Sequence, residues 1–283
     1  MTRRPWFNPH TVTAQIARLD ARADHQEIVR LLFCHEFPWD SLSVEFAFFR
    51  TFAVPSISTL LDHTGEFARR PQKRYDDTDL ILSEIMENGY DSPRGREAIR
   101  RMNQIHRHFN ISNEDYLYVL STFIFEPVRW IERFGWRALT EKEKLANFYF
   151  WLEIGRYMAI QDIPPEYAAF EAYNIAYEQA HFHFHPGNRR VAEATRDLFL
   201  SWYLPAPLYP LGRPFIHALM DDPLREAFGF DPPPPILRQA VKWGLIARGQ
   251  VLHHLPLMRF PHLRTQQKRP TYPNGYNMND IGP

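Results

Sequence analysis

Apolar side chains recur every three or four residues over most of this 283-residue chain, and no feature constrains its fold more. In one segment, Thr140 stands three residues before Glu143, as in a capping box, and apolar residues follow at positions 145, 148 and 152. Ser112 and Asp115 open another helical segment, which Pro127 should end or kink. Residues 163–182, 189–204 and 236–252 repeat the period, and strand patterns are almost absent. The sequence predicts an all-α helical bundle with Pro-containing connections, such as LPAPLYPLGRP and DPPPP.

Charge and cysteine content exclude several classes of partner. The 33 basic and 33 acidic side chains cancel, which argues against nucleic-acid binding. The single cysteine, Cys34, excludes an internal disulfide and is typical of a reducing compartment, and we read it as a small core residue rather than a nucleophile paired with His35. The N-terminal stretch has no apolar signal region, and no apolar run approaches the roughly 20 residues of a membrane span. We therefore expect a cytoplasmic protein without an integral span. Peripheral membrane contact and the oligomeric state stay open.

The stretch REAIRRMNQIHRHF, residues 96–109, carries two histidines on what the pattern predicts to be one helix. At 100° per residue, His106 shares the apolar face and His108 points the opposite way. The other members of that face are apolar: Ile99, Met102, Ile105 and Phe109. A buried imidazole needs a hydrogen-bond partner, a metal or a cofactor iron, so His106 is either an ordinary core histidine or a ligand.

A second group of candidate residues precedes it. On a predicted helix from Arg74 to Asn88, Arg74 and Thr78 lie on one face with two isoleucines, at spacings of four and three. This face would line a pocket whose guanidinium binds a carboxylate and whose hydroxyl binds a polar ligand atom. Alternatively, Arg74 lies in an exposed first turn, with Thr78 or Asp77 capping the helix.

A third candidate is the run AHFHFHPG. In an extended segment His181, His183 and His185 would point to one side, as zinc, copper or non-haem iron sites require. The run also precedes a proline and a glycine, which is typical of a surface loop.

Taken in order, these motifs resemble one known superfamily. The motif RYDDT is followed 28 residues later by His106, and then by YVLSTFIFEPVRWIERFGWRALTEKEKLANFYFWLEIGRYMAIQDIPPEYAAFEAYNIAYE. This pattern resembles the latex clearing proteins and the mycophenolic-acid-type (MpaB) oxygenases. The upstream FPWDSLSVEFAFFRTFAVPSISTLLDHTGEF and the downstream LFLSWYLPAPLYPLGRPF are similar to the MpaB branch. We therefore expect an N-terminal extension at residues 1–29, a haem-binding oxygenase-like domain at 30–260, and a polar, loosely ordered tail at 261–283.

The resemblance implies a globin-like helical core that holds haem b and cleaves a carbon–carbon double bond of a hydrophobic, isoprenoid substrate with dioxygen. It assigns His106 as the axial ligand of the haem iron, and Arg74 and Thr78 as catalytic and cofactor-binding residues on the other side of the haem. Some latex clearing proteins carry a lysine just before that threonine. Here the residue is Asp77. A carboxylate does not suit the iron-ligand role of that lysine, and Asp77 is instead a candidate base. Two alternatives stay open: a non-enzymatic haem or gas-binding protein, and a metal-dependent oxygenase that uses the histidines at 181, 183 and 185.

Overall fold

The computed structural model describes residues 9–38, 40, 42–254 and 261–282. In these residues all regular structure is helical, and no strand occurs, so the all-α prediction is confirmed. The globin-like character of the core stays a prediction. The fourteen α-helices are α1 Pro9–Arg18, α2 His25–Leu31, α3 Leu42–Thr51, α4 Pro55–Thr64, α5 Glu66–Arg69, α6 Pro71–Asn88, α7 Pro93–His106, α8 Asn113–Phe134, α9 Glu141–Tyr157, α10 Tyr167–His181, α11 Pro186–Ser201, α12 Tyr209–Leu219, α13 Asp222–Ala227 and α14 Pro235–His254. Short turns complete the described structure: a π-helical turn, η1 Leu32–Glu36, and three 3₁₀ turns, η2 Ala206–Leu208, η3 Arg264–Gln266 and η4 Met278–Asp280.

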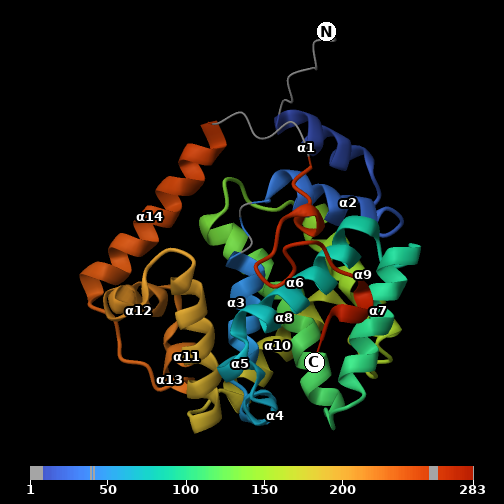
Figure 1. Cartoon of the computed structure of the whole chain (residues 1–283). Coiled ribbons are helices and arrows are strands. Elements are labelled where there is room, and N and C mark those ends of the chain that lie inside the picture. The colour runs from blue at the N-terminus through green and yellow to red at the C-terminus, as the bar shows by residue number, and fades with distance from the viewer. Residues whose placement is uncertain (1–8, 39, 41, 255–260, 283) are drawn as a thin grey trace.

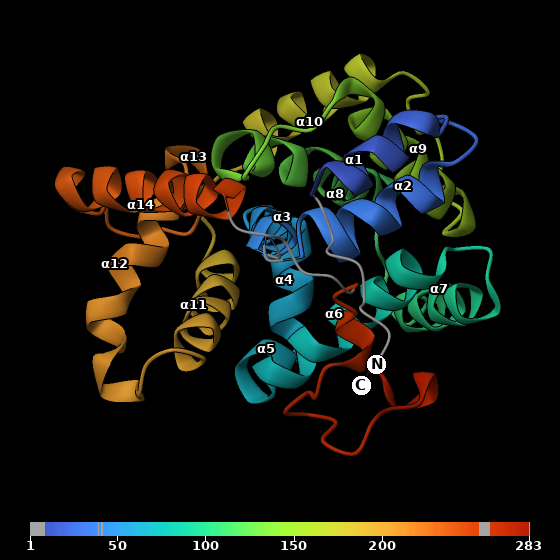
Figure 2. The same ribbon diagram turned by 90° about the horizontal axis from the view of Figure 1, so that it is seen from above.

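Helix α8 lies at the centre of the molecule and packs against α3, α9, α10 and α14 (Figure 1). Helices α6 and α7 form a pair on one side of it. Helices α11 to α14 gather on the opposite side, where α12 and α14 pack together (Figure 2). The N-terminal helices belong to the body of the protein, because Val12 and Ile16 of α1 are buried in a cluster with Val128 and Ile131 of α8. The boundary predicted at residues 29 and 30 falls inside α2.

The predicted helix starts are present. Ser112 caps α8 by accepting from the Asp115 N–H, and Thr140 and Glu143 form the capping box of α9. Pro127, however, lies inside α8, which runs on to Phe134. A proline weakens the helix bonds to the carbonyls one turn before it. The carbonyl that loses its helix donor is that of Phe123, and the Asn147 amide of α9 donates to the next carbonyl, that of Ile124, at 3.0 Å. This tertiary contact supplies a partner that the local pattern cannot reveal.

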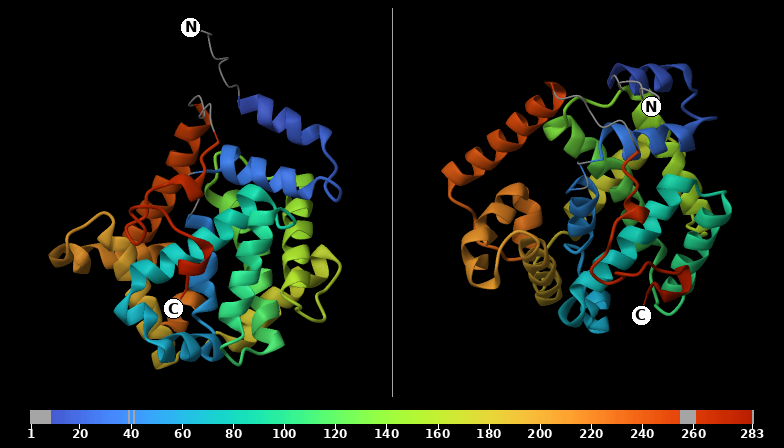
Figure 3. Two further views of the ribbon diagram at one scale, coloured as in Figure 1. Left: turned by 45° about the vertical axis from the view of Figure 1, so that its right-hand side comes forward. Right: turned by 45° about the horizontal axis from the view of Figure 1, so that its top comes forward.

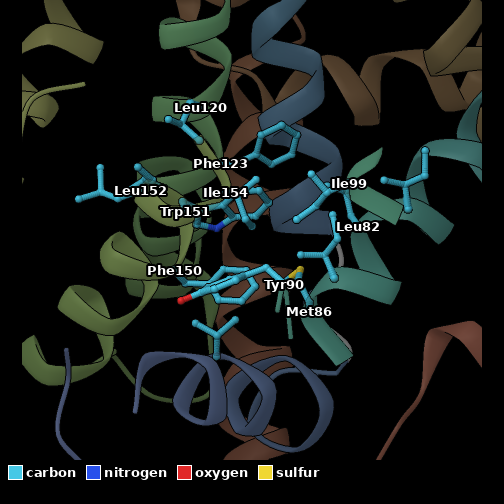
Figure 4. Close-up of a cluster of buried hydrophobic side chains, with 14 of the residues drawn as sticks. Leu82, Met86, Tyr90, Ile99, Leu120, Phe123, Phe150, Trp151, Leu152 and Ile154 are labelled. Carbon is cyan, nitrogen blue, oxygen red and sulfur yellow. The ribbon is translucent and has the colours of Figure 1, made fainter. Parts of the chain in front are cut away.

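The largest core cluster lies between α6, α7, α8 and α9 (Figure 4). It is rich in aromatic rings, and the ring of Phe123 stacks on Trp151 at 5.1 Å between centroids. Leu82 and Met86 of α6 and Ile99 of α7 face these rings. Packing of this kind fixes the α6–α7 pair against the rest of the bundle.

The C-terminal segment, Pro261–Gly282, runs along α6 and reaches α7 (Figure 3). It makes polar contacts with the acidic residues of α6. Tyr276 donates to Glu84 at 2.6 Å, the Arg264 N–H donates to Glu87 at 2.6 Å, and Arg269 pairs with Asp79. Ile281 and Met278 are buried. The segment is therefore attached to α6 by charge and hydrogen-bond pairs and to the main core cluster by the apolar side chains of Met278 and Ile281.

Among the described helices, none alone is long and apolar enough to cross a membrane. Helices α3 and α4 meet that criterion only when taken together, and they are bent by 98° relative to each other.

Candidate functional site

The geometry of the site depends on the tight turn between α6 and α7. Helix α6 ends at Gly89, whose φ of +83° favours glycine, and Ser92 caps α7 by accepting from the Gly95 N–H at 3.0 Å. Gly95 lies so close to the turn that an added Cβ would be 1.9 Å from the Gly89 carbonyl oxygen. Because the two helices are joined by four residues and pack against each other, the beginning of α6 lies beside the end of α7. Arg74 and Thr78 of α6 are about 30 residues from His106 in sequence, and this arrangement brings the two ends of the helix pair together.

His106 is the last residue of α7. Its Nδ1 is buried and has no hydrogen-bond partner among the described residues, and its ring lies edge-on to Tyr116 at 5.6 Å. Burial, and then the charge of Arg74, lower the pKa of His106 to about 4. The imidazole is therefore neutral near pH 7, with a nitrogen lone pair available, as an iron ligand requires. His108 lies outside the helix and is exposed.

Arg74 and Thr78 are one turn apart on α6. The Arg74 guanidinium donates to the Thr78 hydroxyl, which in turn donates to the Arg74 carbonyl at 3.0 Å. The guanidinium carbon lies 5.6 Å from the centroid of the Phe67 ring, and burial lowers the pKa of Arg74. Within the described part of the chain no carboxylate forms an ion pair with Arg74. A half-buried guanidinium without an ion pair is a candidate partner for an anionic group of a ligand.

Arg74 and Thr78 line a cavity of about 50 Å³ between α3, α6 and α11. Its other walls are mostly apolar: Val44, Phe48, Phe52, Phe67, Pro71, Leu198 and Phe199. His106 is not among the lining residues, and the volume is far smaller than that of a porphyrin. An apolar chain suits these walls. To fit between α6 and α7, a larger planar group would require the side chains there to move apart.

Comparison with known proteins assigns the family. Residues 46–250 match the model described as "ER-bound oxygenase mpaB/B'/Rubber oxygenase, catalytic domain". The chain belongs to this family. It is 31% identical over 90% of its length to the ER-bound oxygenase mpaB' of Penicillium brevicompactum, of which it spans 64%. It is 31% identical over 68% of its length to the ER-bound oxygenase mpaB of Penicillium roqueforti, of which it spans 70%. The match to mpaB of Penicillium brevicompactum covers 73% of this chain and 57% of the relative, at 30% identity. The resemblance to the MpaB branch is thus confirmed.

Three residues that line the cavity of this MpaB-family chain were not apparent as site residues in its sequence. Tyr75 and Glu45 line the Arg74 cavity, and the Tyr75 hydroxyl donates to Glu45 at 2.8 Å. Burial, and then the charge of Glu45, raise the pKa of Tyr75. The sequence offered one signal for Glu45. It is a carboxylate within the apolar run SVEFAFF, and a buried acid needs a hydrogen-bond or ionic partner. Arg264 lies on the same cavity and comes from the C-terminal segment, so no local pattern indicated it.

Asp77 lies away from this cavity. Its carboxylate accepts from Lys73 at 2.8 Å, from the Tyr272 hydroxyl at 2.5 Å and from the Gly282 N–H at 3.1 Å. These contacts attach the C-terminal segment to α6. The residue that caps α6 is Arg70, so neither Asp77 nor Thr78 is a helix cap.

The remaining candidates occupy other places. His181 ends α10 and stacks on Tyr177 at 4.0 Å, and the ring of His185 accepts from the Gly187 N–H at the start of α11. Across the described ranges no three His, Cys, Asp or Glu side chains are grouped as a metal site requires. Cys34 is fully buried, which raises its pKa to about 12 and leaves it as a thiol.

Proposed function

We propose that this protein is a haem-dependent oxygenase that uses dioxygen to cleave a carbon–carbon double bond of a hydrophobic, isoprenoid-type substrate. Membership of a family named for oxygenases supports the reaction class. The observation that supports the cofactor is the half-buried imidazole of His106, which is neutral near pH 7 and whose buried Nδ1 has no hydrogen-bond partner among the described residues. A core histidine of ordinary structural role has its ring nitrogens satisfied.

The donor set fits a haem. His106 would hold the haem iron through an imidazole nitrogen, and Arg74 would hold a propionate or a carboxylate of the substrate. When bound, haem would supply the iron chemistry that activates dioxygen. Because the cavity at Arg74 is small, we expect haem binding to displace aromatic side chains that line it, such as Phe67.

The remaining chemistry rests on binding and orientation. The apolar walls around Phe48 and Phe199 exclude water and hold the substrate chain. The Thr78 hydroxyl donates to the Arg74 carbonyl in the structure, and on substrate binding it would turn to donate to an oxygen atom at the reacting end instead. In the overall reaction the double bond breaks, and each of its carbons takes one atom of dioxygen to become a carbonyl. No external reductant is needed.

Cofactor binding is tested by titrating the purified protein with haem and recording the visible spectrum. We expect a Soret band whose position reports a histidine ligand and which is lost or shifted in His106→Ala. His108→Ala is the matched control, because that ring lies two residues away and is exposed. An unchanged spectrum in His106→Ala contradicts the proposed ligand.

Activity is tested by incubating the haem-loaded protein with prenylated compounds under dioxygen and analysing the products for carbonyls. Thr78→Val should lower turnover while the Soret band of bound haem is retained. Arg74→Met should also lower turnover, and it should weaken haem binding in the titration where the guanidinium holds a propionate. Haem binding without turnover across a broad panel of prenylated compounds would assign the chain to non-enzymatic haem proteins instead.

A further inference from the structure

The C-terminal segment contributes a residue to the site although it lies outside the family-matched residues 46–250. Arg264, in η3, lines the Arg74 cavity opposite the apolar walls. Its guanidinium pairs with Asp79 at 2.6 Å and donates to the Tyr75 hydroxyl at 3.2 Å. Its backbone N–H is fixed separately by Glu87. The side chain is therefore held at both ends.

Arg264 also lines a second cavity, of about 70 Å³. This cavity lies between α2, α3, α6, α8 and α9, and most of its lining is apolar: Val29, Leu32, Phe33, Met86, Phe123 and Trp151 are among the residues. Only Val44 and Arg264 appear in the walls of both cavities. The two hollows therefore adjoin at these two side chains, with the guanidinium as the polar element between two apolar spaces.

The charged side chain of Arg264, at the border of the two cavities, is an obstacle to an apolar chain that would extend from one into the other. To pass from one cavity to the other, an alkyl chain would have to displace the Arg264 side chain, which is 13% exposed and whose guanidinium is paired with Asp79. Breaking that pair in a buried place leaves two unpaired charges, which an alkyl chain cannot compensate. The passage is closed while Arg264 is present.

We propose that Arg264 sets the length of the apolar chain that the protein accepts, by closing the inner end of the Arg74 cavity. The ligand class is a linear, uncharged hydrocarbon chain with one polar end, and the second cavity is the space it would occupy without Arg264. The inference depends on the proposed function only in identifying the Arg74 cavity as the substrate site.

The test is a binding series that needs neither haem nor dioxygen. Straight-chain alcohols of increasing length are titrated into the full-length protein, and their dissociation constants are measured by displacement of a fluorescent apolar dye. For wild type we expect affinity to rise about fourfold per added methylene until the cavity is filled, and then to level off. In Arg264→Ala the increase should continue to longer chains, so that each methylene beyond the wild-type limit again adds about fourfold.

Arg269→Ala is the matched control. Arg269 belongs to the same segment and pairs with the same carboxylate, Asp79, but it lines neither cavity. In Arg264→Ala, moreover, Asp79 keeps Arg269 as its cation, so the fold should survive, as circular dichroism can verify. The proposal is overturned if folded Arg264→Ala levels off at the wild-type chain length, or if Arg269→Ala lengthens the accepted chain equally. A shifted limit without any oxygenase turnover would leave this inference standing and contradict the proposed function.

Discussion

Gly95 offers the sharpest test of how the site is assembled. A helical glycine replaced by alanine gains about 1 kcal/mol when nothing opposes the new methyl group. At Gly95 the added Cβ would lie 1.9 Å from the Gly89 oxygen and 2.8 Å from the Gly89 carbonyl carbon, and both are backbone atoms. Overpacking of this kind costs about 1–3 kcal/mol or more, because α7 must move away from the turn. Because the gain of about 1 kcal/mol offsets part of this cost, we expect Gly95→Ala to lose up to about 2 kcal/mol of unfolding free energy, or more where α7 cannot move.

Gly244 is the matched control, because it lies inside α14 and its added Cβ meets nothing within 4 Å. Gly244→Ala should therefore be neutral or more stable than wild type by up to about 1 kcal/mol. Urea denaturation followed by circular dichroism measures both variants, and haem titration shows whether moving α7 weakens binding at His106. Equal stability of the two variants would refute the close approach at the α6–α7 turn and, with it, the geometry of the site.

Three further predictions concern the surrounding fold. The side chain of Arg50 is 10% exposed and pairs with Glu178 and other carboxylates. Arg50→Met should lower the unfolding free energy by about 3–5 kcal/mol, because it leaves buried charges unpaired, and adding Glu178→Met should recover part of this loss, as measured by urea denaturation. Burial, and then the charge of Arg196, lower the pKa of His217 to about 4, so the folded protein loses stability as the pH falls from about 6.5 to 4. In thermal melting at a series of pH values, His217→Gln should reduce this dependence of stability on pH. Thr140→Ala should cost about 1 kcal/mol of unfolding free energy and Thr140→Ser almost nothing, because serine keeps the capping oxygen.

Local features of the fold could be predicted from sequence, and features that depend on distant partners could not. The caps at Ser112 and Thr140 form with residues three positions away, so their spacing is sufficient. The continuation of α8 through Pro127 was not predictable, because part of its support comes from Asn147 on another helix. The proximity of His106 to Arg74 follows from the short turn at Gly89 and from the close approach of Gly95, which periodicity alone does not give.

The acidic residues of α6 show why the C-terminal segment escaped prediction. Five carboxylates within 12 residues are typical of a solvated helix face: Asp76, Asp77, Asp79, Glu84 and Glu87. Four of these side chains are buried. Besides local partners such as Lys73, each accepts from a residue of the C-terminal segment about 180 to 200 residues further along the chain, as in Thr265 with Glu87 and Tyr272 with Asp77. No sequence period encodes such pairs.

This pairing gives α6 two functions in one helix. The face that carries Arg74 and Thr78 lines the cavity, while the acidic face binds the C-terminal segment, and Asp79 belongs to both because it lines the cavity and holds Arg264. Any displacement of the segment from α6 therefore removes Arg264 from the cavity wall and leaves Asp79 without its partners. The segment, which lies beyond the family-matched region, is thus coupled to the candidate site through Asp79 and Tyr75, because Arg264 contacts both and both line the cavity.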